Sequence, residues 1–126
     1  MKRALSVLSI AIGFAACSNP VEVSSSDIVS ARAEAKVLTI TNTSDDPVYY
    51  FVADREALAL LDWAVCRDPS TCKAVAPHSS KRIVYSEIAA YQTGSGSAVV
   101  FHWKLFAQGS GGYNYDSVRE LVVKLN

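Results

Sequence analysis

The sequence predicts an all-β domain that folds as a two-sheet antiparallel sandwich. From residue 27 onward, apolar and polar side chains mostly alternate with a period of two, which is the pattern of strands with one covered face. Short clusters of Gly, Pro, Asn, Asp and Ser separate these alternating runs. Only one brief stretch, residues 54–61, has the pattern of a helix. About seven short strands and one short helix are typical of a sandwich.

The first predicted strands lie between residues 27 and 52. In residues 27–36 alanines alternate with charged residues, which favours a strand, although the alanine content and a cap at Asp27 also suit a helix. Residues 37–42 (VLTITN) and 48–52 (VYYFV) are rich in β-branched and aromatic side chains and flank a turn cluster. We expect these two runs to pair as a hairpin.

The middle of the chain contains the helix and a second predicted hairpin. The helix, residues 54–61, begins at a capping aspartate, and we expect its two turns to cross from one sheet to the other. Residues 62–66 and 72–77 flank a five-residue loop that contains an Asp-Pro turn. If these two segments pair antiparallel, Trp63 lies opposite Val75.

Three further runs complete the predicted strands: residues 81–85, 98–107 and 118–125. Residues 98–107 form the longest of them, and we expect one face of this strand to be buried and the other, which carries His102, to be half exposed. In the last strand we expect three apolar side chains to point inward: Leu121, Val123 and Leu125.

The order and length of these runs favour an immunoglobulin-like or fibronectin-like topology. A small closed β-barrel is the alternative, because periodicity alone does not separate the two. The glycine-rich segments 93–97 and 108–114 lack the spacing of phosphate-binding loops and are interpreted as connections between strands.

The first seventeen residues have the layout of an export signal. Lys2 and Arg3 precede a short apolar run that ends in Phe14-Ala15-Ala16-Cys17. This end resembles a bacterial lipobox, with Phe14 where Leu is usual. The resemblance implies cleavage before Cys17 and lipidation of that cysteine. An ordinary secretory signal cleaved near Ala16 is the alternative, and the apolar run is too short to span a bilayer.

The signal predicts three segments. Residues 1–16 are the lipoprotein signal peptide, residues 17–26 are the lipidated N-terminus and a flexible tether, and residues 27–126 are the sandwich domain. Lipoproteins with Ser after the cysteine are usually sent to the outer membrane, so Ser18 implies a lipid anchor in the bacterial outer membrane, facing the periplasm.

The three cysteines fit this compartment. If Cys17 is lipidated, Cys66 and Cys72 remain as an even pair in an oxidising space, which predicts a disulfide. The spacing Cys-x5-Cys differs from the Cys-x-x-Cys motif of thiol oxidoreductases, and no second cysteine pair completes a tetrahedral metal site.

Charge and motif content argue against several classes of function. Ten basic and twelve acidic side chains remain after the signal, without a basic run, so we expect no nucleic-acid partner. No Gly-x-Ser-x-Gly motif accompanies His78 or His102, so we expect no catalytic residues and no enzyme activity. The only methionine is Met1, so a copper site is unfavoured, and we expect no metal and no cofactor.

Tyrosines supply the remaining candidate binding residues. Tyr113 and Tyr115 lie in or next to a glycine-rich loop, a composition that binding loops use, and Tyr91 precedes another such loop. The alternative is that these side chains flank sheet edges with their hydroxyl groups in water.

The chain resembles small bacterial envelope lipoproteins in its signal and in four places: residues 48–51, residues 63–66, Cys72 and residues 83–85. This resemblance implies no activity. We expect a lipid-anchored, non-enzymatic interaction or structural module that contacts the membrane and an envelope or secreted protein. Because lipoproteins of this size with a disulfide-tied β-fold include hydrolase inhibitors, the alternative is an inhibitor of a secreted hydrolase such as lysozyme.

Overall fold

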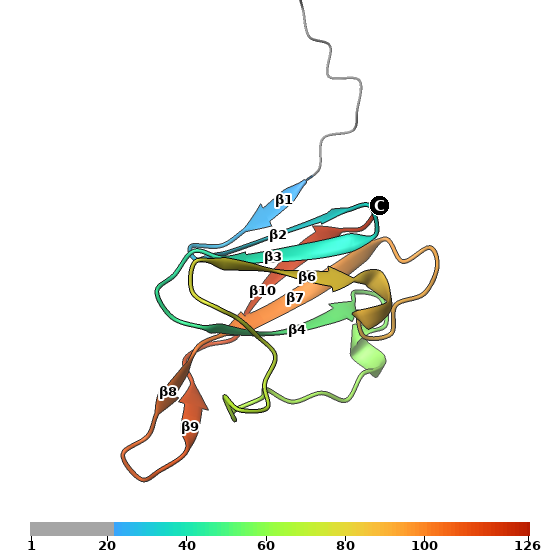
Figure 1. Ribbon diagram of the computed structural model, residues 1–126. Helices are drawn as coiled ribbons and strands as arrows, with labels where there is room; N and C mark the ends of the chain where they lie inside the picture. The colour runs from blue at the N-terminus through green and yellow to red at the C-terminus, as the bar shows by residue number, and fades with distance from the viewer. Residues whose placement is uncertain (1–21) are drawn as a thin grey trace, which may run out of the picture.

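The computed structural model describes residues 22–126, which form two four-stranded antiparallel sheets and a separate two-stranded hairpin (Figure 1). Sheet A has the strand order β1-β2-β3-β6, sheet B has the order β10-β7-β4-β5, and β8 pairs with β9. The predicted signal peptide and Cys17, the predicted lipidation site, lie outside the described residues. The strands are β1 (Val23–Ser25), β2 (Val29–Glu34), β3 (Val37–Asn42), β4 (Val48–Asp54), β5 (Ala74–Val75), β6 (Ser79–Val84), β7 (Ser97–Trp103), β8 (Leu105–Ala107), β9 (Tyr113–Tyr115) and β10 (Arg119–Lys124).

The predicted sandwich is confirmed. Both sheets are open, so the closed barrel is excluded, and there are ten strands because several are only two or three residues long. The order β2-β3-β6 matches strands A-B-E of an immunoglobulin-type fold, and β10-β7-β4-β5 matches strands G-F-C-C′.

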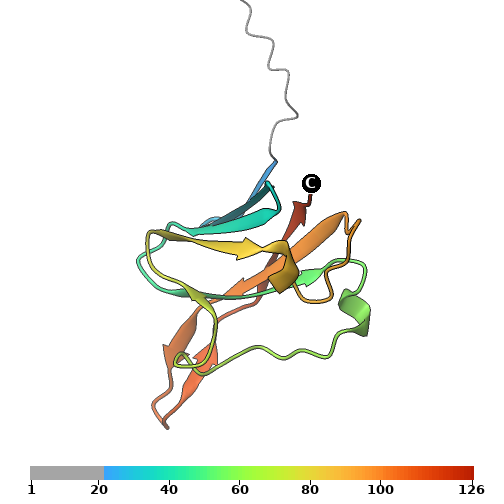
Figure 2. The same ribbon diagram turned by 45° about the vertical axis from the view of Figure 1, so that its right-hand side comes forward.

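The core lies between the two sheets, which Figure 2 shows as two layers. The two central strands of sheet A, β2 and β3, alternate buried residues with more exposed ones, and the inward residues of β2 are Val29, Ala31 and Ala33. Sheet B contributes its own inward side chains, including Val100 and Val123. Because both sheets share this one core, residues 22–126 constitute a folding unit.

The first predicted hairpin is wrong. β3 pairs with β2 and β6, whereas β4 pairs with β5 and β7, so residues 43–47 carry the chain from sheet A to sheet B. The buried side chain of Asn42 stabilises this crossing, because its Nδ2 donates to the carbonyl oxygens of Asp46 (2.7 Å) and Val75 (3.1 Å) and its Oδ1 accepts from the Ser44 amide (2.9 Å). The hairpin of β3 is instead made with β2, through Ala35 and Lys36.

The predicted two-turn helix is also wrong. Asp54 Oδ2 accepts a hydrogen bond from the Ala57 amide (3.0 Å), as a cap does, but only one 3-10 turn follows, η1 (Leu58–Leu60), and it buries no residue. The strands on either side, β4 and β5, both belong to sheet B, so this segment does not change sheets. No helix among residues 22–126 is long and apolar enough to cross a membrane.

The Cys66–Cys72 disulfide is present, with an S–S distance of 2.04 Å, but the strands predicted beside it are not. Residues 61–68 have no strand, and Val75 pairs with Val48 rather than facing Trp63. The tryptophan ring instead packs on the outer face of sheet B.

The predicted strand 98–107 divides at Lys104. β7 ends at Trp103, and β8 leaves the sheet to pair with β9. Both faces of β7 are buried, which corrects the expected half-exposed face. The face of Val100 and His102 points into the core between the sheets, and the segment between β4 and β5 covers the opposite, outer face. The inward side chains predicted for the last strand are confirmed, with Leu121, Val123 and Leu125 all in the core.

Candidate functional site

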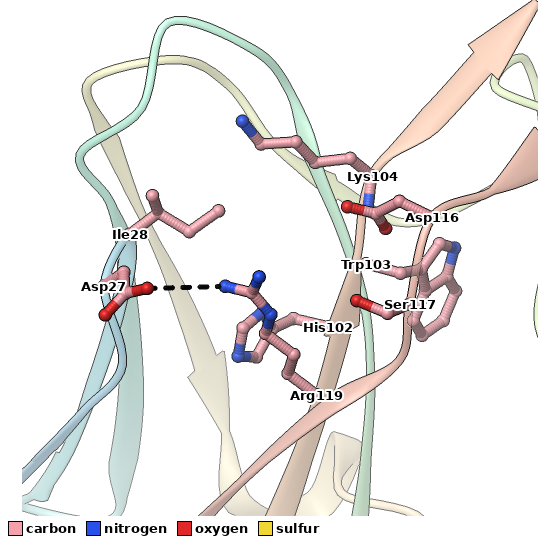
Figure 3. A pocket seen from close by; sticks show the side chains of 8 residues that line it. All are labelled: Asp27, Ile28, His102, Trp103, Lys104, Asp116, Ser117 and Arg119. Carbon is pink, nitrogen blue, oxygen red and sulfur yellow. Dashed lines mark hydrogen bonds and ion pairs between the residues drawn. The ribbon is translucent and has the colours of Figure 1, made fainter.

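One end of the sandwich combines a pocket with a projecting hairpin. The pocket has a volume of about 240 Å³ and lies between the turn that precedes β2 and the adjoining parts of β7 and β10 (Figure 3). Its floor and wall come from strands, and its rim from the base of the β8–β9 hairpin. The lining residues are Asp27, Ile28, His102, Trp103, Lys104, Asp116, Ser117 and Arg119.

His102 is the most buried polar group of this pocket. It has a relative exposure of 1%, which corrects the expectation that this histidine lies on a solvated face. Its Nε2 lies 3.4 Å from Ser26 Oγ. Burial lowers the pKa of His102 and the nearby Arg119 cation lowers it further, while the Asp116 carboxylate acts in the opposite direction.

Charges of both signs surround this histidine. Arg119 Nη1 lies 3.9 Å from Asp27 Oδ2, as the dashed line in Figure 3 shows. Lys104 Nζ lies 3.2 Å from Asp46 Oδ2. These exposed or half-exposed pairs add little stability, but they give the pocket a polar, nearly balanced lining.

The Ser26 hydroxyl beside His102 has a backbone partner as well. The Ser26 hydroxyl also lies 3.3 Å from the Val29 carbonyl oxygen, to which it donates. The second histidine, His78, is exposed in a turn, where its Nε2 contacts Asp45 Oδ1 at 2.6 Å. Among residues 22–126, no group of three or more His, Cys, Asp or Glu side chains is arranged to hold a metal ion.

The β8–β9 hairpin projects from the sandwich (Figure 1), and residues at its base line the pocket. Its base is tied to the sheet because Asp116 Oδ1 accepts from the Lys104 amide (3.0 Å) and the Asp116 amide donates to the Lys104 carbonyl oxygen (3.2 Å). Beyond this base, Phe106 and Tyr113 are 49% and 45% exposed. Their cross-strand partners are Asn114 and Ala107, so the two rings lie on opposite faces of the hairpin.

The structure separates the three tyrosines proposed for partner binding. Tyr91 follows the end of β6, where its ring packs against Tyr85 at a centroid distance of 5.4 Å. Tyr113 and Tyr115 lie on β9, at the opposite end of the sandwich. Tyr115 is half buried, and the guanidinium carbon of Arg67 lies 5.2 Å from the centre of its ring. Only Tyr113 and Tyr115 therefore share a surface.

An aromatic cluster on the outer face of sheet B supports the hairpin. The Trp63 ring lies 4.7 Å from both Phe51 and Phe101, and the Trp103 Nε1 donates to the Cys66 carbonyl oxygen at 3.0 Å. Tyr115 packs against the same cluster. The alternating pattern of β7 does not predict this cluster. Trp63, a large apolar side chain close to Cys66, is the one sequence feature that indicates a covered surface there.

Known proteins give no further guide to this site. Comparisons of the chain with protein-family models, with curated proteins and with solved structures find no match. The interpretation of the pocket and the hairpin therefore depends on their own geometry and chemistry.

Proposed function

We propose that the protein is a lipid-anchored binding module of the bacterial cell envelope, and that the β8–β9 hairpin is its contact surface for an envelope or secreted protein. The hairpin is the observation that carries this proposal. The hairpin exposes two large aromatic side chains, Phe106 and Tyr113. On the surface of a monomeric domain most exposed side chains are polar, and exposed apolar side chains are usually isolated.

The hairpin has the features of a preorganised contact. Its base is fixed by the backbone and side-chain hydrogen bonds between Lys104 and Asp116, and Arg67 packs over Tyr115. Because the hairpin is already held in place, it loses less conformational entropy when a partner binds. Aromatic side chains also bring large contact areas at a small entropic cost.

The signal and the disulfide support the proposed location. The disulfide Cys66–Cys72 is the form that cysteines adopt in an oxidising compartment, and Cys17 is the remaining cysteine. The first described position, residue 22, is five positions after Cys17, so an anchor there holds the domain within about 18 Å of the lipid surface. In Figure 1 the described chain enters the sandwich on the side away from the hairpin.

The anchor is tested by mass spectrometry of the protein isolated from bacterial membranes. The expected N-terminal peptide begins at Cys17 and carries acyl chains, and a Cys17→Ser variant should accumulate unprocessed. A peptide that begins at another residue, with an unmodified Cys17, would contradict the proposed anchor without affecting the proposed contact surface.

The contact surface is tested by cross-linking in intact cells followed by identification of the captured protein. A Phe106→Ser/Tyr113→Ser variant should lose this capture, whereas Leu60→Ser, which removes an apolar side chain that is 88% exposed elsewhere, should retain it. Equal capture by the unmodified protein, the hairpin variant and Leu60→Ser would contradict a role for the hairpin.

A second candidate function is inhibition of a secreted hydrolase, because a projecting hairpin has a shape that fits an enzyme cleft. The same variants test this function. Residues 22–126 should then reduce the activity of a lysozyme, and the hairpin variant should not. Unchanged lysozyme activity at saturating concentrations of the domain would exclude lysozyme as the target.

A further inference from the structure

The outer face of sheet A, on the side away from the core, has two arginines in one cross-strand row. Arg32 on β2 and Arg82 on β6 both lie opposite Thr39 on β3, and both are exposed. Two strand spacings place their backbones about 10 Å apart. Together they line a shallow groove of about 460 Å³.

Neither arginine is neutralised within the described part of the chain. The ion pairs among residues 22–126 involve other cations, and none of them includes Arg32 or Arg82. Glu34 lines the same groove, two residues along β2 from Arg32. Like charges in one row repel each other, and an anion held between them removes this repulsion.

Hydroxyl groups occupy the positions next to the arginines. Thr39 lies between them, and the neighbouring row consists of Ser30, Thr41 and Ser80, in which Thr41 Oγ1 lies 2.8 Å from Ser80 Oγ. Guanidinium groups, with five donors in a planar fork, and hydroxyl groups are both suited to the oxygens of a phosphate group.

We propose that this groove binds a phosphate group between Arg32 and Arg82. The arginines supply charge-assisted hydrogen bonds from two sides, and Thr39 supplies a hydroxyl donor beneath them. A soluble phosphate ester and a phospholipid headgroup present the same chemical group. The site depends on neither the proposed anchor nor the hairpin, which lies beyond the end of sheet B.

The test is a titration of isotopically labelled residues 22–126 with inorganic phosphate, followed through the arginine Nε–Hε signals in NMR spectra. The signals of Arg32 and Arg82 should shift together along one saturating curve. Arg32→Gln or Arg82→Gln should each weaken binding by about tenfold. Glu34→Gln should strengthen binding, because it removes the one acidic group of the groove.

Arg55→Gln is the matched control, because Arg55 is an exposed arginine outside the groove and its replacement changes the net charge equally. This variant should bind phosphate as the unmodified protein does. Equal weakening by Arg55→Gln, or shifts that are spread over all basic residues and do not saturate, would overturn the proposal.

A second measurement separates the two sources of phosphate. Residues 22–126 are sedimented with vesicles of phosphatidylglycerol, again with the Arg32→Gln and Arg55→Gln variants. Sedimentation that only Arg32→Gln abolishes identifies lipid headgroups as the source, while saturable binding of inorganic phosphate without sedimentation identifies a soluble ligand. Binding in neither experiment would overturn the site.

Discussion

Burial of His102 between the two sheets links the stability of the domain to pH. Burial and the Arg119 cation lower the pKa of His102 in the folded state below its usual value of 6.5. Between these two pKa values the unfolded chain binds more protons than the folded one, so stability rises with pH in this range. The free energy of unfolding should therefore fall as the pH drops below about 6.5 and level off below the folded-state pKa.

Urea denaturation at several pH values between 5 and 8 measures this dependence. A His102→Gln variant should be less stable at neutral pH but should lose the decrease in stability below pH 6.5. His78→Gln, at an exposed position, is the control and should keep that decrease. An unchanged pH dependence of stability in His102→Gln would show that His102 does not cause the decrease.

Individual side chains differ in how well the sequence predicts their surroundings. Leu121 and Val123 were assigned correctly because the opposite face of β10 carries the charged side chains of Glu120 and Lys124. His102 was not, because its face of β7, shared with Val100, points into the core between the sheets, and periodicity does not show which face of a strand the other sheet covers. The candidate pocket could not be predicted either, since it combines the ends of β7 and β10 with a turn far away in the sequence.

At the scale of elements, the two-residue turn between β2 and β3 has a conformation that its side chains disfavour. Ala35 and Lys36 have φ angles of 51° and 61°, in the left-handed region where Asn and Gly are preferred. An Ala35→Asn/Lys36→Gly variant should therefore be more stable, by about 1 kcal/mol. Thermal unfolding followed by circular dichroism measures this change, and Ala35→Pro should lower stability because proline cannot adopt a positive φ. A destabilised Asn-Gly variant would contradict this account of the turn.

The disulfide fastens the segment that covers sheet B. Cys66 and Cys72 close a short loop, and a Cys66→Ser/Cys72→Ser variant should lose about 2 kcal/mol of stability on chain-entropy grounds. Exchange of the Trp103 indole proton should also become faster, because this group donates to the Cys66 carbonyl oxygen. NMR hydrogen exchange measures the effect. An unchanged exchange rate would show that aromatic packing alone holds the segment.

The pattern of side chains predicts strands better than it predicts their pairing. The runs at 37–42 and 48–52 are both strands, but a five-residue turn cluster can close a hairpin or carry the chain to the other sheet. The buried Asn42 decides in favour of the crossing, and its hydrogen bonds reach Val75, which is distant in the sequence. Local periodicity contains no information about such a contact.

At the scale of the whole molecule, the shared core predicts one cooperative unfolding transition. Ile40 of sheet A is fully buried against residues of sheet B, so an Ile40→Ala variant should be destabilised by about 2–5 kcal/mol. Urea curves recorded by circular dichroism and by fluorescence of Trp63 and Trp103 should coincide. Separate transitions for the two signals would show that the outer aromatic cluster unfolds independently.

The sandwich as a whole could be predicted because its class depends on the number and period of strands, which are local properties. The way in which the two sheets pack against each other depends on long-range contacts. The same contacts bring the pocket and the hairpin together at one end of the molecule.

The positive charge of the edge strand β6 affects how molecules of this protein associate when they are crowded on one surface. β6 is one of the two edge strands of sheet A, and it exposes Lys81 and Arg82. Positive side chains on an open edge oppose edge-to-edge stacking into fibrils, to which uncharged strands are prone. A dense two-dimensional layer of this protein should therefore stay dispersed, and neutralising β6 would favour polymerisation.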